Sequence, residues 1–194
     1  MNDNLVSILD SSSSSCGVKV HEYKGLPVSE LVFSAELLKS CETNVCGYYN
    51  KSWSCPPASG TIEEQKEKIL KYKDVFVFST KHYLEDSFDY EGMIKGKEHH
   101  NFLTINFQDR LGNSFPVYGA GSCPICTESC AAKKDENKKN HCSFPAPCSF
   151  PEKRIGSIEA AGINVTELCK AAGITYNNGI DTVTYFSMVL SNKR

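Results

Sequence analysis

Eight of the ten cysteines fall in two blocks, and this clustering constrains the chain more than any other feature. The first block has the spacing C-x4-C-x8-C-P-P, and the second begins C-x2-C-x3-C. The whole chain has 194 residues, of which 40% are hydrophobic, so it can bury a core without a metal. The cysteines are therefore expected to build a site. The members of the two blocks are Cys41, Cys46 and Cys55, then Cys123, Cys126, Cys130, Cys142 and Cys148.

The N-terminal run MNDNLVSILDSSSSS has no basic start and no long apolar segment, so it does not resemble a secretory signal. Nowhere do about 18 apolar residues follow one another, as a membrane span requires. We therefore expect a cytoplasmic protein without a membrane partner. In the cytoplasm, ten cysteines indicate metal or redox chemistry rather than structural disulfides. A net charge of −2 gives no basic field for a nucleic-acid partner.

Periodicity and turn signals predict an alternation of helices and strands. The order favours a single α/β or α+β domain, with a small mixed sheet flanked by helices and two cysteine-rich cluster-binding loops, 41–57 and 119–154. The serine-rich residues 1–16 are expected to form a flexible tail, and 17–194 an iron–sulfur-binding domain. Strands are predicted at 17–23, 75–80, 114–121 and 182–190, and helices at 34–41, 61–73, 90–111 and 165–172.

The local chemistry of the cysteines favours iron–sulfur clusters over zinc. A C-x2-C-x3-C run lets one short loop wrap a bulky inorganic cube, whereas structural zinc sites more often use two separated C-x2-C pairs. Proline follows Cys55 and Cys123 directly and stiffens both loops. Gly119 and Gly121 are expected to let backbone amides approach sulfur. A zinc site and a redox disulfide remain open alternatives.

The first block supplies only three thiolates, one fewer than a cubane cluster takes. The missing ligand can come from Cys130 or Cys142 of the second block, or the fourth iron can be open to a substrate. In the second case, Tyr48, Tyr49 and Lys51 are expected to line a pocket at the open iron. Lys51 is then the candidate catalytic residue, because its charge can balance developing negative charge.

Three segments, YYNKSWSCPP (48–57), GAGSCPIC (119–126) and CSFPEKRIGSIEAAGINV (148–165), resemble in order the motifs of a prokaryotic family of small cysteine-rich proteins. That family is described as a domain of unknown function or as a predicted metal-binding protein. Its typical members carry S-M-E-A and G-I-D-V where this chain has Ile158 and Asn164. The resemblance implies iron–sulfur binding, mainly in anaerobes, without an established reaction. Carried across, it places one site on Cys41, Cys46 and Cys55, and the other on Cys123, Cys126, Cys148 and either Cys130 or Cys142.

The sequence thus predicts a cytoplasmic protein with one or two 4Fe–4S clusters. Its function is expected to be electron transfer or a small cluster-based redox reaction, with a redox partner protein or a small-molecule substrate. Two alternatives stand beside this interpretation. One is a zinc-stabilised structural or interaction module, and the other is a non-redox enzyme that uses an open iron of the three-cysteine site.

Overall fold

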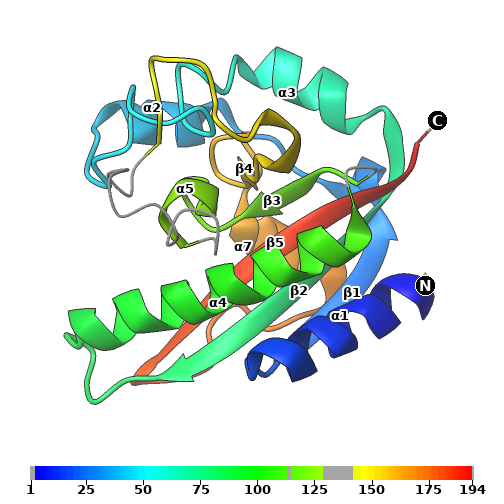
Figure 1. Cartoon of the computed structure of the whole chain (residues 1–194), viewed down its shortest axis with the longest axis vertical. Helices are drawn as coiled ribbons and strands as arrows, with labels where there is room; N and C mark the ends of the chain where they lie inside the picture. The colour runs from blue at the N-terminus through cyan, green and yellow to red at the C-terminus, as the bar shows by residue number, and fades with distance from the viewer. Residues whose placement is uncertain (1–2, 113–114, 129–141, 194) are drawn as a thin grey trace.

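A five-stranded mixed sheet with the order β1-β2-β5-β3-β4 forms the centre of the protein (Figure 1). The computed structural model describes residues 3–112, 115–128 and 142–193. Neighbouring strands are antiparallel, except that β3 and β4 are parallel. The predicted single domain with a small mixed sheet flanked by helices is confirmed. The strands are β1 (Glu22–Pro27), β2 (Tyr72–Tyr83), β3 (Val117–Gly119), β4 (Gly156–Ser157) and β5 (Thr182–Lys193).

Strand β2 is buried on both of its faces, as its continuous apolar run predicts. Side chains alternate between the two faces of a strand. Val75 and Val77 therefore enter one hydrophobic core, and Phe76 and Phe78 enter the other. The strand pairs with β5 along almost its whole length, from Tyr72 to Tyr83, so these two strands form the backbone of the sheet.

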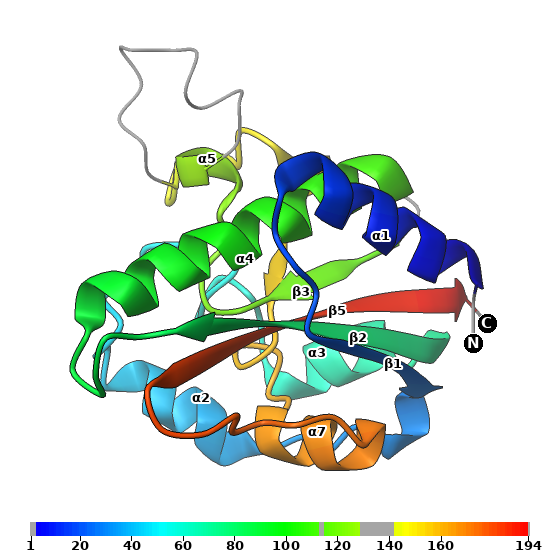
Figure 2. The same ribbon diagram turned by 90° about the horizontal axis from the view of Figure 1, so that it is seen from below.

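Helices cover both faces of the sheet (Figure 2). On one side lie α1 (Asp3–Cys16) and α4 (Tyr90–Leu111), which contribute Leu5 and Phe107 to the core around Phe76. On the other side lie α3 (Ile62–Ile69) and α7 (Val165–Ala172). Helix α3 begins with a capping box, in which Thr61 and Glu64 each accept a hydrogen bond from the backbone N–H of the other. Among the described residues, none of the helices has the length and apolar character needed to cross a bilayer.

The prediction of a flexible tail is wrong for residues 3–16, which form α1. Leu5 and Leu9 lie one helical turn apart and are 1% and 0% exposed against the sheet. The serine hydroxyls bond to carbonyls of the helix itself, for example Ser12 Oγ to Ile8 O at 2.8 Å. The first strand was also expected too early, at 17–23, and instead spans Glu22–Pro27.

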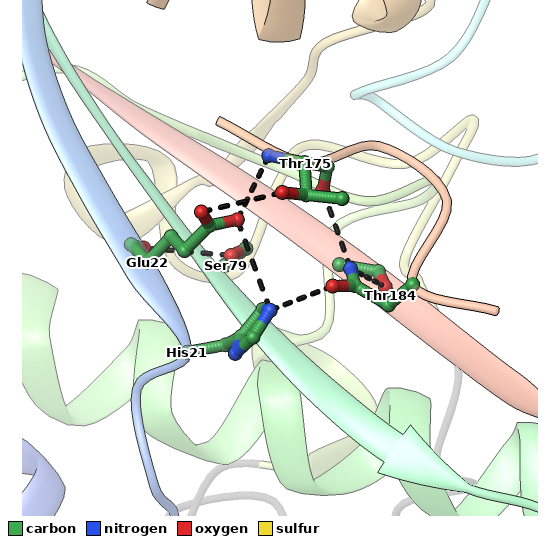
Figure 3. A network of polar contacts seen from close by, with 6 residues as sticks. His21, Glu22, Ser79, Thr175 and Thr184 are labelled. Atoms are coloured by element: carbon green, nitrogen blue, oxygen red, sulfur yellow. Dashed lines mark hydrogen bonds and ion pairs between the residues drawn. The ribbon is translucent and has the colours of Figure 1, made fainter. Parts of the chain in front are cut away.

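Polar side chains fasten the loop after α7 to strands β1 and β5 (Figure 3). The backbone N–H of Thr175 donates to Glu22 Oε2 at 2.8 Å. Asn178 lies between two strands, since its Oδ1 is 2.8 Å from His21 Nε2 and its Nδ2 donates to Thr184 Oγ1 at 2.8 Å. These contacts fix the loop against the sheet.

Candidate metal centre

The two cysteine-bearing loops lie side by side at one end of the sheet, next to β3 and β4 (Figure 1). Two side chains of the first loop hold the second. Trp53 Nε1 donates to Ala146 O at 2.9 Å, and its ring packs edge-on against Phe144 at 5.2 Å between centroids. Ser54 Oγ accepts a hydrogen bond of 2.7 Å from the backbone N–H of Cys123. The loops therefore form one continuous unit, although residues 58–118 separate them in the sequence.

The structure brings the three thiols of the first block together. Cys41 lies in the last turn of α2 (Ala35–Glu42), Cys46 is exposed in the following loop, and Cys55 is only 7% exposed. Burial raises the pKa of Cys55 to about 11; hydrogen bonds from Ser54 and Ser52 oppose this, while Cys46 and Cys41 add to it. Burial also raises the pKa of Cys41, and the charges of Cys46 and Glu159 raise it further.

A cavity of about 270 Å³ opens onto the first block. Its lining includes the three cysteines together with Tyr48 and Tyr49, which were predicted to lie there. Lys51 is exposed and does not belong to the lining, contrary to expectation. The cation that lines the cavity is Lys97, from the middle of α4, and the carboxylate is Glu159, just after β4.

Four thiols of the second block also lie close to one another. Cys126 is carried by the short helix α5 (Ile125–Glu128). Its pKa is raised by burial and then by the charges of Cys142 and Cys148. Burial raises the pKa of Cys123 to about 12; backbone N–H donors oppose this rise, and Cys126 and Cys148 add to it. The structure thus places Cys142 with the second block, while Cys130 lies outside the described residues.

Backbone donors to sulfur come from positions that the sequence did not indicate. The N–H of Ile155 donates to Cys123 Sγ at 3.4 Å. Gly121 was expected to bring its amide to sulfur, but its N–H donates instead to Glu159 Oε2 at 3.3 Å. The residue has a φ of +77°, and a Cβ there would lie 3.0 Å from Lys97 Nζ. A side chain at 121 would therefore strain the backbone and press against Lys97 in the cavity of the first block, and glycine avoids both.

The chemistry of these side chains fits a metal centre. All nine cysteines in the described part of the chain are free thiols. A pKa of about 11 or 12 keeps Cys55 and Cys123 protonated at neutral pH, so a bound metal must displace their protons. Within the described ranges, however, no group of three or more histidine, cysteine or acidic side chains is arranged to hold a single ion.

Three residues of the site were missed by the sequence reasoning. Glu159 stands within the segment SIEAAGI, whose resemblance was noted but whose acidic member was not considered as a site residue. Ser54 lies between two residues that were considered, and only the contact with Cys123 reveals its role. Lys97 occupies one turn of a long helix and has no local signal. Cys169, in contrast, lies on α7 and is 1% exposed in the core, away from both blocks.

The fold and the site together define a small cysteine-rich α+β domain with two clusters of free thiols at one end of its sheet. The chain belongs to the family described as predicted metal-binding protein (DUF2284), whose model matches residues 24–191. The family resemblance inferred from the motifs is thereby confirmed. The description specifies metal binding but names neither the metal nor a reaction. No curated protein and no solved structure matches the chain.

Proposed function

We propose that the protein binds two 4Fe–4S clusters, one at each cysteine block, and uses them for electron transfer or for a small redox reaction. One observation carries this proposal. Each cysteine block gathers three or more free thiols that lie close enough to affect one another's charge. Four thiolates are the ligand set of a cubane cluster, and the C-x2-C-x3-C run of the second block lets one short loop wrap such a cube.

The ligands follow from the grouping of the thiols. Cys123, Cys126, Cys142 and Cys148 form the four-thiolate set that a cubane cluster takes. The first block would hold the other cluster through its three cysteines. When bound, each cluster supplies one-electron chemistry. The chain's own contribution is burial of the sulfurs and N–H donation to them, such as that of Ile155 to Cys123, which favours the reduced state.

The contact between the loops supports electron exchange between the two clusters. Ser54 precedes Cys55 of the first block, and its hydroxyl accepts the N–H of Cys123 of the second. A ligand of one cluster is thus separated from a ligand of the other by a single side chain. We further propose that the protein works in the cytoplasm, where thiols stay reduced, and that electrons come from or go to a redox partner protein.

The cavity at the first block favours an enzymatic use of that cluster. Three thiolates leave one iron of a cube without a cysteine, and the cavity gives a small molecule access to that side. Lys97 supplies a positive charge at the same place, the role that the sequence had suggested for Lys51. A substrate that gains negative charge during the reaction would be stabilised there.

Anaerobic purification with iron and sulfide determination tests the proposal. We expect a brown protein with about eight irons and eight labile sulfides per chain. Cys46→Ser and Cys126→Ser should each lose about half of the iron and a different electron paramagnetic resonance signal, because each removes a ligand of one cluster. Cys16→Ser is the matched control and should keep all the iron, since Cys16 lies at the end of α1. Colourless protein that contains zinc would refute the proposal.

A further inference from the structure

Glu159 is the only carboxylate among the residues that line the cavity of the first block in the described structure. Hydrogen bonds hold one of its two carboxylate oxygens. Its Oε2 accepts hydrogen bonds from Ser157 Oγ at 2.9 Å and from the Gly121 N–H at 3.3 Å. Among the described residues, no donor bonds to the other oxygen, Oε1. The carboxylate is therefore oriented by two donors while one of its oxygens stays available.

The charge of Glu159 lies close to the thiols of the first block. Glu159 lines the same cavity as Cys41, Cys46 and Cys55. In the described structure, no lysine or arginine forms an ion pair with Glu159, although Lys97 lines the same cavity. Lys97 gives the cavity a single positive charge, which does not balance a carboxylate together with three thiolates. Iron in a cluster would supply the remaining positive charge.

We propose that Glu159 is the fourth protein ligand of the first cluster, binding through oxygen the iron that the three cysteines leave free. This inference rests on the proposed two-cluster function and specifies the ligand set of its first site. Cys142, the thiol considered for the same position, instead lies with Cys126 of the second block. The first block therefore has a carboxylate oxygen in its cavity, whereas the thiol of Cys142 lies at the second block.

An oxygen ligand gives this iron a distinct behaviour. Thiolate is the soft ligand that iron–sulfur clusters favour, whereas a carboxylate is a harder donor that binds their iron less firmly. Glu159 would protect the iron at rest and yield to an incoming small molecule from the cavity. Ser157 and Gly121 would hold the displaced carboxylate close by, so that it can bind again when the product leaves.

The test uses ferricyanide as the oxidant, on full-length, cluster-loaded protein. Oxidation of a cube with a weakly held iron releases one ferrous ion, while one electron passes to ferricyanide and a three-iron cluster remains. Glu159→Gln keeps the shape but binds iron poorly, so it should lose about one iron per chain at a ferricyanide dose that leaves the wild type intact. Glu159→Cys should retain its iron at a higher dose than the wild type, because a thiolate replaces the oxygen donor.

Iron content and the electron paramagnetic resonance signal of the three-iron cluster are the readouts. Glu30→Gln is the matched control, since it makes the same chemical change at an exposed carboxylate and should behave as the wild type. If Glu159→Gln and Glu159→Cys both match Glu30→Gln, the assignment of Glu159 is overturned while the two clusters stand. Wild-type protein without iron at the first block would instead overturn the proposed function itself. If Glu159→Gln fails to fold, the response of Glu159→Cys decides.

Discussion

Acid should destabilise this protein through one buried histidine, and the effect can be isolated with a single variant. His100 of α4 is 0% exposed. Its Nδ1 lies 2.9 Å from Thr80 Oγ1, and its Nε2 lies 2.8 Å from Ser187 Oγ. These two partners are hydroxyls, which satisfy the neutral ring but offer no negative charge to a protonated one. Burial lowers the pKa of His100 to about 3; a backbone hydrogen bond with Phe186 opposes this, and the charge of His82 adds to the lowering.

The sign and the size of the effect follow from this shift. A histidine titrates near 6.5 in the unfolded chain. Because the folded pKa is depressed, the neutral ring contributes stability above pH 6.5, and this contribution is lost as pH falls toward 3. Between these values the unfolded chain binds one more proton at this position. The free energy of unfolding should therefore fall by about 1.4 kcal/mol per pH unit, and by about 5 kcal/mol at most.

Urea unfolding at pH 7, 6, 5 and 4 measures this loss. His100→Gln keeps hydrogen-bonding groups but does not titrate, so the difference in pH dependence between it and the wild type isolates His100. His82, which shares Thr80 as a hydrogen-bond partner, stays in both proteins. We expect the wild type to lose about 2 to 3 kcal/mol more than the variant between pH 6.5 and 4. Parallel loss in both proteins would contradict the reasoning.

Three further predictions concern the site. Ser54→Ala leaves the Cys123 N–H without its acceptor and should lower the free energy of unfolding by about 1–3 kcal/mol, as urea titration can show; an unchanged midpoint would contradict the loop contact. Gly121→Ala and Gly112→Ala should each lose about 1–2 kcal/mol, because both glycines have positive φ. Only Gly121→Ala should alter the spectrum of the first cluster, since only there does a Cβ meet Lys97. In metal-free protein, zinc used as a probe should bind about tenfold more tightly per pH unit for each thiol that it deprotonates; equal affinities at pH 6.5 and 7.5 would disprove that proton release.

The regular elements could be predicted because their signals are local. The apolar run of β2 and the spacing within α4 each depend on neighbouring residues, and each element appears where it was expected. The serine-rich segment 3–16 was misjudged because its helix depends on tertiary packing. Leu5 and Leu9 are too few to reveal an amphipathic helix in the sequence, but the core at Phe76 buries them completely.

The membership of the site could be predicted only in part, for the same physical reason. Cysteine spacing separates the two blocks, but it does not reveal which spare thiol folds back onto which block. The position of Cys142 depends on Trp53, which holds the segment around Ala146 by a hydrogen bond. Lys97 and Glu159 reach the cavity from α4 and from the turn after β4. Contacts between residues so far apart in the chain have no local pattern.

The hydrogen bonds of Trp53 and Ser54 across the two loops also bear on how the protein matures. A cluster bound at the second block, as proposed above, would order the segment that receives Trp53 and would fix the Cys123 amide that binds Ser54. Trp53 and Ser54 lie directly before Cys55, so the loop of the first block would become better ordered as the second is filled. Filling one block would therefore favour filling of the other, while each block keeps its own ligands.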